Sequence, residues 1–263
     1  MKFDFTATSA IKVLPPGFKY ISQDNFYIAN LNNQDTTPPI NYLFSDSATS
    51  CIIVIVEGKD KDNNPLVAMA HLSRKERFLA FFEKVSTSFY GKTSVFAQGA
   101  NPANAPASIE NALTLISWVN ENKQNKATQQ WFIEQVSLSV GQGNPQEDDR
   151  GCFGINLSNM TVSNQRFLMT DLERDPSGGS QTLFCVFGLK VEPQVILPEA
   201  GSSFTQAQLN LLVAKAHSEQ WTDILYMTKD EVLNKYSSTP QYEAPWFFSS
   251  LRDSALYVKN FQQ

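Results

Sequence analysis

Two residues of the chain, Cys51 and His71, have the types and the spacing that nucleophilic chemistry on an amide requires. The thiolate is the reactive form of cysteine, and a neighbouring imidazolium stabilises it and later protonates the departing amine. The other two cysteines, Cys152 and Cys185, lie among apolar residues, where packing as small hydrophobic groups is the simpler interpretation. A buried structural thiol is the alternative interpretation for Cys51 as well.

The segments that carry this pair predict a β-hairpin. The run CIIVIV at 51–56 is a short continuous apolar stretch, as in a fully buried strand. The turn-forming segment GKDKDNNP follows it, and LVAMAHLS at 66–73 is then the partner strand. Cys51 stands at the start of the first strand and His71 near the end of the second. The hairpin therefore brings the two residues together.

The rest of the first half predicts alternating strands and helices. We expect one or two strands in 18–30, a strand in 92–102 that ends in a Gly-Asn-Pro loop, and two more strands in 131–141 and 151–157. Segment 73–91 predicts a helix capped by Ser73, with the apolar spacing of Phe78, Leu79, Phe82 and Val85. Segment 106–123 predicts an amphipathic helix with the apolar face Ile109, Leu113, Ile116 and Val119.

Beyond residue 160 the pattern is weaker. Segment 181–193, QTLFCVFGLKVEP, predicts an apolar strand, and 205–226 predicts a helix. His217 lies on that helix, where a histidine is more often exposed or structurally satisfied than catalytic. We expect residues 1–162 to form a catalytic core and residues 163–263 a C-terminal αβ extension packed on it as one domain.

Composition excludes several classes of function. The 263 residues are 42% hydrophobic and 18% charged, with a net charge of -5, and no cluster of Lys and Arg with interleaved aromatics predicts nucleic-acid binding. No window has the apolar length of a membrane span, and Asp4 and the prolines interrupt any N-terminal secretory signal. We therefore expect a soluble protein made in the cytoplasm that binds neither nucleic acid nor membranes.

Metal and cofactor chemistry are not expected either. The three cysteines are widely spaced and the chain has only two histidines, so no zinc pattern is present. The acidic segment Glu147, Asp148 and Asp149 is the alternative metal site, but paired acids in a turn usually form a solvated hairpin tip. The segment QGANP lacks the order of a phosphate-binding loop.

From SDSATSC to MAHLS the chain resembles the glutamine deamidase family of the bacterial chemotaxis protein CheD. In that family a strand and loop end in Gly-Ser-Cys, and an apolar strand, a turn and a strand ending in Met-Ala-His follow. The matching stretches here are TSCIIVIV and VAMAHLS, with Thr49 in place of the glycine. A weaker resemblance extends over residues 18 to 162. Cytotoxic necrotizing factor and Burkholderia lethal factor, toxins that deamidate a glutamine of a host protein, share this catalytic core.

The resemblance implies a set of site residues and a fold. Cys51 is implied as the nucleophile, His71 as the base, and Ser45, six positions before the cysteine, as the hydroxyl residue that orients the histidine. The usual residue there is threonine, and Ser47 and Thr49 are open alternatives. Gln98 and Asn101 are expected to contact substrate. The implied fold is α/β, a layered β-sandwich core flanked by helices.

The implied activity is protein-glutamine deamidation through a Cys-His thioester. The long C-terminal extension favours a bacterial toxin or virulence effector that acts on a host protein, reaching the host cell without a cleavable signal peptide. Transglutamination of the same thioester, a cysteine protease, and a non-enzymatic interaction module with this fold are the alternatives. The target glutamine and the oligomeric state are open.

Overall fold

The computed structural model describes residues 2–5, 9–32, 38–123, 129–141 and 151–262. The chain divides into two compact units, residues 1–168 and 169–263. The short strand β10, Thr161–Ser163, therefore belongs wholly to the first unit. Each unit is described by itself below. Among the described residues, no helix is long and apolar enough to cross a lipid bilayer.

In its described residues, the first unit contains two five-stranded sheets and two helices. The strand order is β1-β10-β9-β4-β2 in the first sheet and β3-β6-β5-β7-β8 in the second. The remaining elements are β1 (Lys2–Asp4), β2 (Phe18–Tyr20), β3 (Phe26–Asn30), β4 (Tyr42–Ser45), β5 (Ile52–Lys59), β6 (Pro65–Leu72), α1 (Lys75–Ser88), β7 (Tyr90–Gly99), α2 (Pro106–Asn122), β8 (Trp131–Val140) and β9 (Phe153–Asn156).

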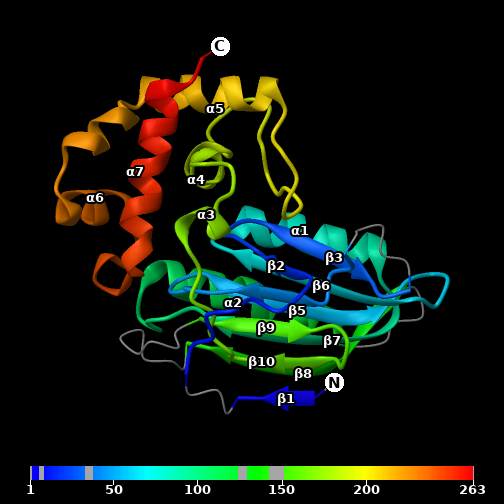
Figure 1. The fold of residues 1–263 in the computed structure, drawn as a ribbon. Helices are drawn as coiled ribbons and strands as arrows, with labels where there is room; N and C mark the ends of the chain where they lie inside the picture. Colours follow the sequence, from blue (N-terminus) through cyan, green and yellow to red (C-terminus); the bar gives the residue numbers. More distant parts are fainter. Residues whose placement is uncertain (1, 6–8, 33–37, 124–128, 142–150, 263) are drawn as a thin grey trace. The chain divides into compact units, whose positions relative to one another are not determined.

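The two sheets stack face to face, and α1 and α2 lie on the outer face of the second sheet (Figure 1). Aromatic contacts join the sheets: the rings of Phe3 on β1 and Phe96 on β7 have centroids 5.2 Å apart. On the helical side, Phe82 of α1 stacks on Trp118 of α2 with centroids 4.0 Å apart. The expectation of a mixed α/β fold is therefore confirmed at the level of sheets and helices.

The predicted hairpin is present as β5 and β6, which pair in antiparallel register with Ile53 opposite His71. Strand β5 lies in the middle of its sheet between β6 and β7, and its residues 52–56 are all buried. A strand covered on one face by a second sheet and on the other by helices needs apolar side chains at every position. This explains the unbroken run IIVIV.

The predicted apolar face of α2 is wrong for three of its four residues, and only Val119 is buried as expected. Ile109 and Leu113 have exposed fractions of 45% and 61%, and Ile116 is exposed as well. The helix instead buries the face that carries Ser108, Asn111, Leu115, Trp118 and Val119. Asn111 belongs to this inward face because it donates hydrogen bonds to two backbone carbonyls. A polar side chain with such partners is stable in the interior, and hydrophobicity alone cannot reveal those partners.

Helix α1 differs from its prediction in two details. Its N-cap is Arg74, and the hydroxyl of Ser73, expected to cap the helix, donates to Asp24 instead. Leu79 is exposed, whereas Phe78, Phe82 and Val85 are buried as expected.

The second unit is helical within the described residues, which corrects the expected αβ extension. Its elements are α3 (Asp171–Arg174), α4 (Ser180–Phe187), α5 (Gln206–Ser218), η1 (Trp221–Tyr226), α6 (Lys229–Tyr236), η2 (Pro240–Tyr242) and α7 (Pro245–Asn260). The predicted strand at 181–193 begins as helix α4. Ser180, Leu183, Phe184 and Phe187 are its buried residues, a helical spacing that the continuous apolar run conceals. The three apolar residues Leu183, Phe184 and Phe187 pack with Trp221 and Leu251 in the core of this unit.

Replacing Leu115 by Ala tests the corrected orientation of α2. Leu115 is fully buried, so we expect the free energy of unfolding to fall by about 2–5 kcal/mol. The control Leu113→Ala lies two residues away on the exposed face and should change it by less than about 0.5 kcal/mol. Urea titrations of both variants provide the measurement. A larger loss for Leu113→Ala would contradict this helix orientation.

Candidate active site

Ser45 and His71 are joined by a hydrogen bond of 2.8 Å between Ser45 Oγ and His71 Nδ1. Ser45 ends β4 in the first sheet, and His71 lies on β6 in the second, so this bond crosses the sandwich. The Ser45 hydroxyl also donates to the carbonyl oxygen of Ile21 at 2.6 Å. A hydroxyl has one proton to donate, so Ser45 Oγ accepts from Nδ1–H of His71. His71 is then the Nδ1–H tautomer, and its Nε2 carries a free lone pair.

The environment of His71 keeps the imidazole neutral. Burial lowers the pKa of His71 from its ordinary 6.5 to about 3. Its Nε2 is buried with no hydrogen-bond partner among the described residues. A neutral imidazole with an unpaired Nε2 is a proton acceptor. His71 is therefore neutral and able to act as a base in the resting protein. The imidazolium that the sequence predicts beside the thiolate forms only when His71 takes a proton.

The register of the second sheet puts Cys51 on the same side as His71. Ile53 is directly opposite His71, and Cys51 precedes Ile53 by two residues. The amide of Ala100 donates to the Cys51 carbonyl at 2.8 Å, which continues the pairing of β5 with β7 to this residue. Because side chains alternate along a strand, Cys51 and His71 are diagonal neighbours, about 7–8 Å apart between Cα atoms. Side chains of this length can span such a separation.

The loop after β7 holds the backbone around Cys51. A Cβ at Gly99 would lie 2.2 Å from the Cys51 carbonyl oxygen, and Gly99 has φ +135°, so only glycine fits there. The amide of Asn101 donates to the carbonyl of Thr49 at 2.7 Å. The loop that the sequence predicts at the end of this strand is therefore present, and Asn101, expected to contact substrate, is buried within it. Gln98 is half-buried one residue before the turn.

Asn111 of α2 links the two segments that carry Cys51 and His71. Its Nδ2 donates to the carbonyls of Ser50 and Ser73, each at 2.9 Å. Ser50 directly precedes Cys51, and Ser73 lies two residues after His71. Asn111 is 1% exposed, and its bond to Ser50 is buried whereas its bond to Ser73 is partly buried. Asn111 thus fixes the ends of the two strands relative to each other.

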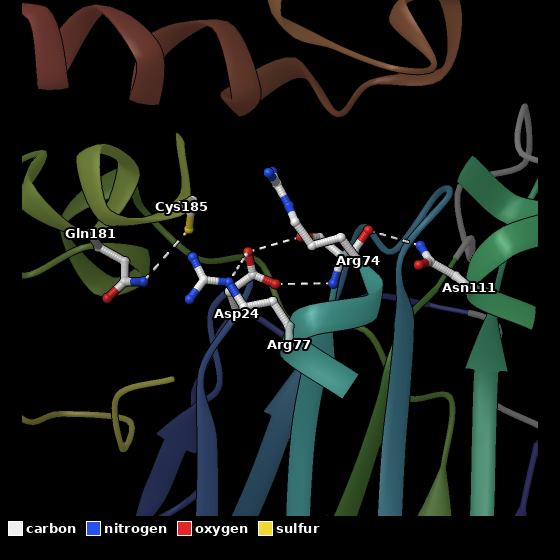
Figure 2. A network of polar contacts seen from close by, with 7 residues as sticks. Asp24, Arg74, Arg77, Asn111, Gln181 and Cys185 are labelled. Atoms are coloured by element: carbon white, nitrogen blue, oxygen red, sulfur yellow. Dashed lines mark hydrogen bonds and ion pairs between the residues drawn. The ribbon is translucent and has the colours of Figure 1, made fainter. Parts of the chain in front are cut away.

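A buried polar network supports the same strand end, as Figure 2 shows for Asp24, Arg77 and Asn111. The Asp24 carboxylate accepts from the Ser73 amide at 3.0 Å and from the Ser73 hydroxyl at 2.8 Å, and Arg77 Nε lies 3.4 Å from it. Burial raises the pKa of Asp24, and the Arg77 guanidinium and the Ser73 hydrogen bonds oppose that rise.

The backbone of His71 is fixed from the same side. The amide of Asp24 donates to the His71 carbonyl at 2.7 Å, and the amide of His71 donates to the Asn25 carbonyl at 3.2 Å. Neither Asp24 nor Asn111 is predicted from the sequence as a site residue. An acidic residue before an apolar strand and an asparagine within a helix are common, and only the fold brings them to the segments around Cys51 and His71.

The alternatives to Ser45 as the partner of His71 have other surroundings. Ser47 has φ +57°, and Thr49 is a buried residue whose carbonyl accepts from Asn101. Cys152 is buried at the start of β9, and Cys185 and His217 lie in the second unit. The acidic segment 147–149 lies outside the described residues. Within the described ranges, no group of three or more His, Cys, Asp or Glu residues could hold a metal ion.

No protein-family model matches the chain, and no curated protein matches it.

The lowered pKa of His71 makes stability depend on pH. The unfolded chain binds a proton at this residue below pH 6.5 and the folded chain does not until about pH 3, so stability is lost as pH falls through this window. Between pH 7 and 5.5 we expect the free energy of unfolding to drop by about 1 kcal/mol more in the wild type than in His71→Gln. Urea titrations at both pH values measure this. Equal drops would show that His71 is not desolvated.

Replacing Asn111 by Ala should loosen the site. It leaves the buried carbonyl of Ser50 and the partly buried carbonyl of Ser73 without this donor, and we expect a loss of about 2–4 kcal/mol in the free energy of unfolding. The control Asn120→Ala changes an exposed asparagine of the same helix and should have little effect. Urea titration separates the two variants. Equal stability of Asn111→Ala and Asn120→Ala would contradict this role of Asn111.

Proposed function

We propose that the protein is a cysteine-dependent protein-glutamine deamidase with Cys51 as nucleophile, His71 as base and Ser45 as the residue that orients the base. The observation that carries the proposal is the hydrogen bond from His71 Nδ1 to Ser45 Oγ, which leaves a neutral Nε2 lone pair. The register of the hairpin makes Cys51 the diagonal neighbour of His71. A thiol is activated by such a base within reach.

The reaction follows from these groups. His71 Nε2 takes the thiol proton as Cys51 Sγ bonds to the carboxamide carbon of a substrate glutamine. The carbon–nitrogen bond then breaks, and the nitrogen takes the proton from His71 Nε2 and leaves as ammonia. Water gives a proton to His71 as its oxygen bonds to the thioester carbon, the carbon–sulfur bond breaks to release glutamate, and His71 returns the proton to the departing Cys51 thiolate. The buried surroundings of His71 favour return of the proton, since they destabilise the imidazolium.

Two further features support a deamidase of the CheD and necrotizing-factor kind. The nucleophile and base lie on neighbouring strands of one hairpin, as in that family, whereas papain-type proteases place the histidine far downstream of the cysteine. The two stacked sheets with helices on an outer face agree with the layered β-sandwich that this resemblance implies. In this proposal the helical second unit contributes to the choice of target, as in a toxin or effector that acts on a host protein.

Mass spectrometry of host-cell lysate tests the activity. Lysate proteins incubated with the wild-type chain should show conversion of one or a few glutamines to glutamate, with release of ammonia. Cys51→Ala should abolish the conversion because no thioester can form. The control Cys152→Ala removes a cysteine outside the proposed mechanism and should leave the conversion intact. Full conversion by Cys51→Ala would refute the proposal.

Alkylation separates an active site from an interaction module that only keeps the fold. Cys51 and Cys152 are 7% and 6% exposed, so access to them is matched. We expect iodoacetamide near neutral pH to modify Cys51 at least about tenfold faster, because activation by a base raises thiol reactivity. Peptide mapping over time gives both rates. Equally slow modification would favour the inactive module.

A further inference from the structure

A small cavity of about 170 Å³ lies in the first unit at the β8 side of the sandwich. Phe3, Phe5 and Phe153 line it from the first sheet and the N-terminal segment, and Gln98 and Ser139 line it from the second. Gln98 of β7 is opposite Ser139 of β8, so both side chains lie on the same face. The volume is well below the roughly 300–1,000 Å³ of sites for drug-sized ligands. It suits a single side chain.

The cavity adjoins the candidate active site on both sheets. In the first sheet Phe153 is the direct partner of Ser45. In the second sheet Ile53 lies between Gln98 and His71, since it pairs with both. Gln98 also precedes Gly99, whose Cα is packed against the Cys51 carbonyl. The cavity therefore begins two strands away from the base, with β5 between them, and next to the backbone of the nucleophile.

The lining of the cavity combines aromatic rings with neutral polar groups. Among its described lining residues none is charged, and the polar side chains include Gln98, Ser139 and Asn164. Asn164 Oδ1 is buried with no hydrogen-bond partner among the described residues, so a ligand N–H would satisfy it. A carboxylate or an ammonium would find no opposite charge here. A carboxamide on an aliphatic stem matches the rings through its methylenes and the polar groups through its amide.

We propose that this cavity binds the glutamine side chain of the substrate, with Gln98 and Asn164 as the groups that recognise its carboxamide. The inference rests on the proposed deamidase and adds the substrate-binding pocket to it. It also gives Gln98 a position in the site, whereas Asn101 stays within the turn.

Binding of a blocked glutamine residue tests the pocket without turnover. The probe is N-acetylglutamine methylamide, titrated into full-length, ¹⁵N-labelled Cys51→Ala protein and followed by amide chemical shifts. We expect saturable binding, weakened at least about tenfold by Gln98→Leu or Asn164→Leu, because each removes a polar partner of the carboxamide. The matched control Asn120→Leu lies on α2 and should bind as before. The corresponding blocked glutamate should bind at least about tenfold more weakly.

A second variant tests the pocket in case the leucine variants do not fold. Ser139 is exposed at the cavity, so Ser139→Tyr should fold and fill the space with its ring. Loss of probe binding in folded Ser139→Tyr supports the pocket, and unchanged binding, or no saturable binding to Cys51→Ala alone, overturns it.

The same variant separates the pocket from the activity. If Ser139→Tyr with Cys51 intact deamidates lysate proteins at the wild-type rate, the pocket is wrong and the deamidase stands. If the probe binds in the expected pattern but no protein releases ammonia, the pocket stands and the deamidase is wrong.

Discussion

The hydrogen bond between Ser45 and His71 is the interaction on which the site depends, because it selects the tautomer of the histidine. Ser45 Oγ gives its proton to the Ile21 carbonyl and therefore accepts from Nδ1–H. The opposite tautomer would place the proton on Nε2 and leave no base for a thiol. Burial adds to this by lowering the pKa of His71, so the lone pair is available rather than protonated. One serine hydroxyl and the exclusion of water thus define the acid-base chemistry.

The polar side chains of Asn111 and Asp24 fix the ends of the strands that carry the site. Strand β5 begins just after Cys51, and β6 ends just after His71, and strand ends are free to fray unless other contacts tie them. Asn111 binds the backbone beside both residues, and Asp24 binds Ser73 through side chain and backbone. Because these donors and acceptors are buried, each missing partner would leave a desolvated group, which makes the arrangement specific.

The sequence predicts the parts of this protein that rest on local pattern. The β5–β6 hairpin is found where the apolar run and the turn residues predict it, and the extent of α2 is nearly as predicted. The failures come from long-range contacts. The face of α2 that carries Asn111 is buried because the hydrogen-bond partners of Asn111 are carbonyls of other segments. The segment around Cys185 is a helix because its apolar residues pack within a helical unit. The tautomer of His71 also depends on a carbonyl, that of Ile21, which no motif contains.

The placement of Ser45 and His71 on different sheets has a consequence for how the protein tolerates change. A hydrogen bond is sensitive to displacements of a few tenths of an ångström, whereas a packed sandwich accommodates such shifts with little loss of stability. The spacing between the layers is set by interlayer side chains such as Leu43 and Ile155, which are both fully buried. Substitutions in these layers are therefore constrained by the alignment of Ser45 with His71 as well as by folding, and a chain can stay folded after this hydrogen bond is lost.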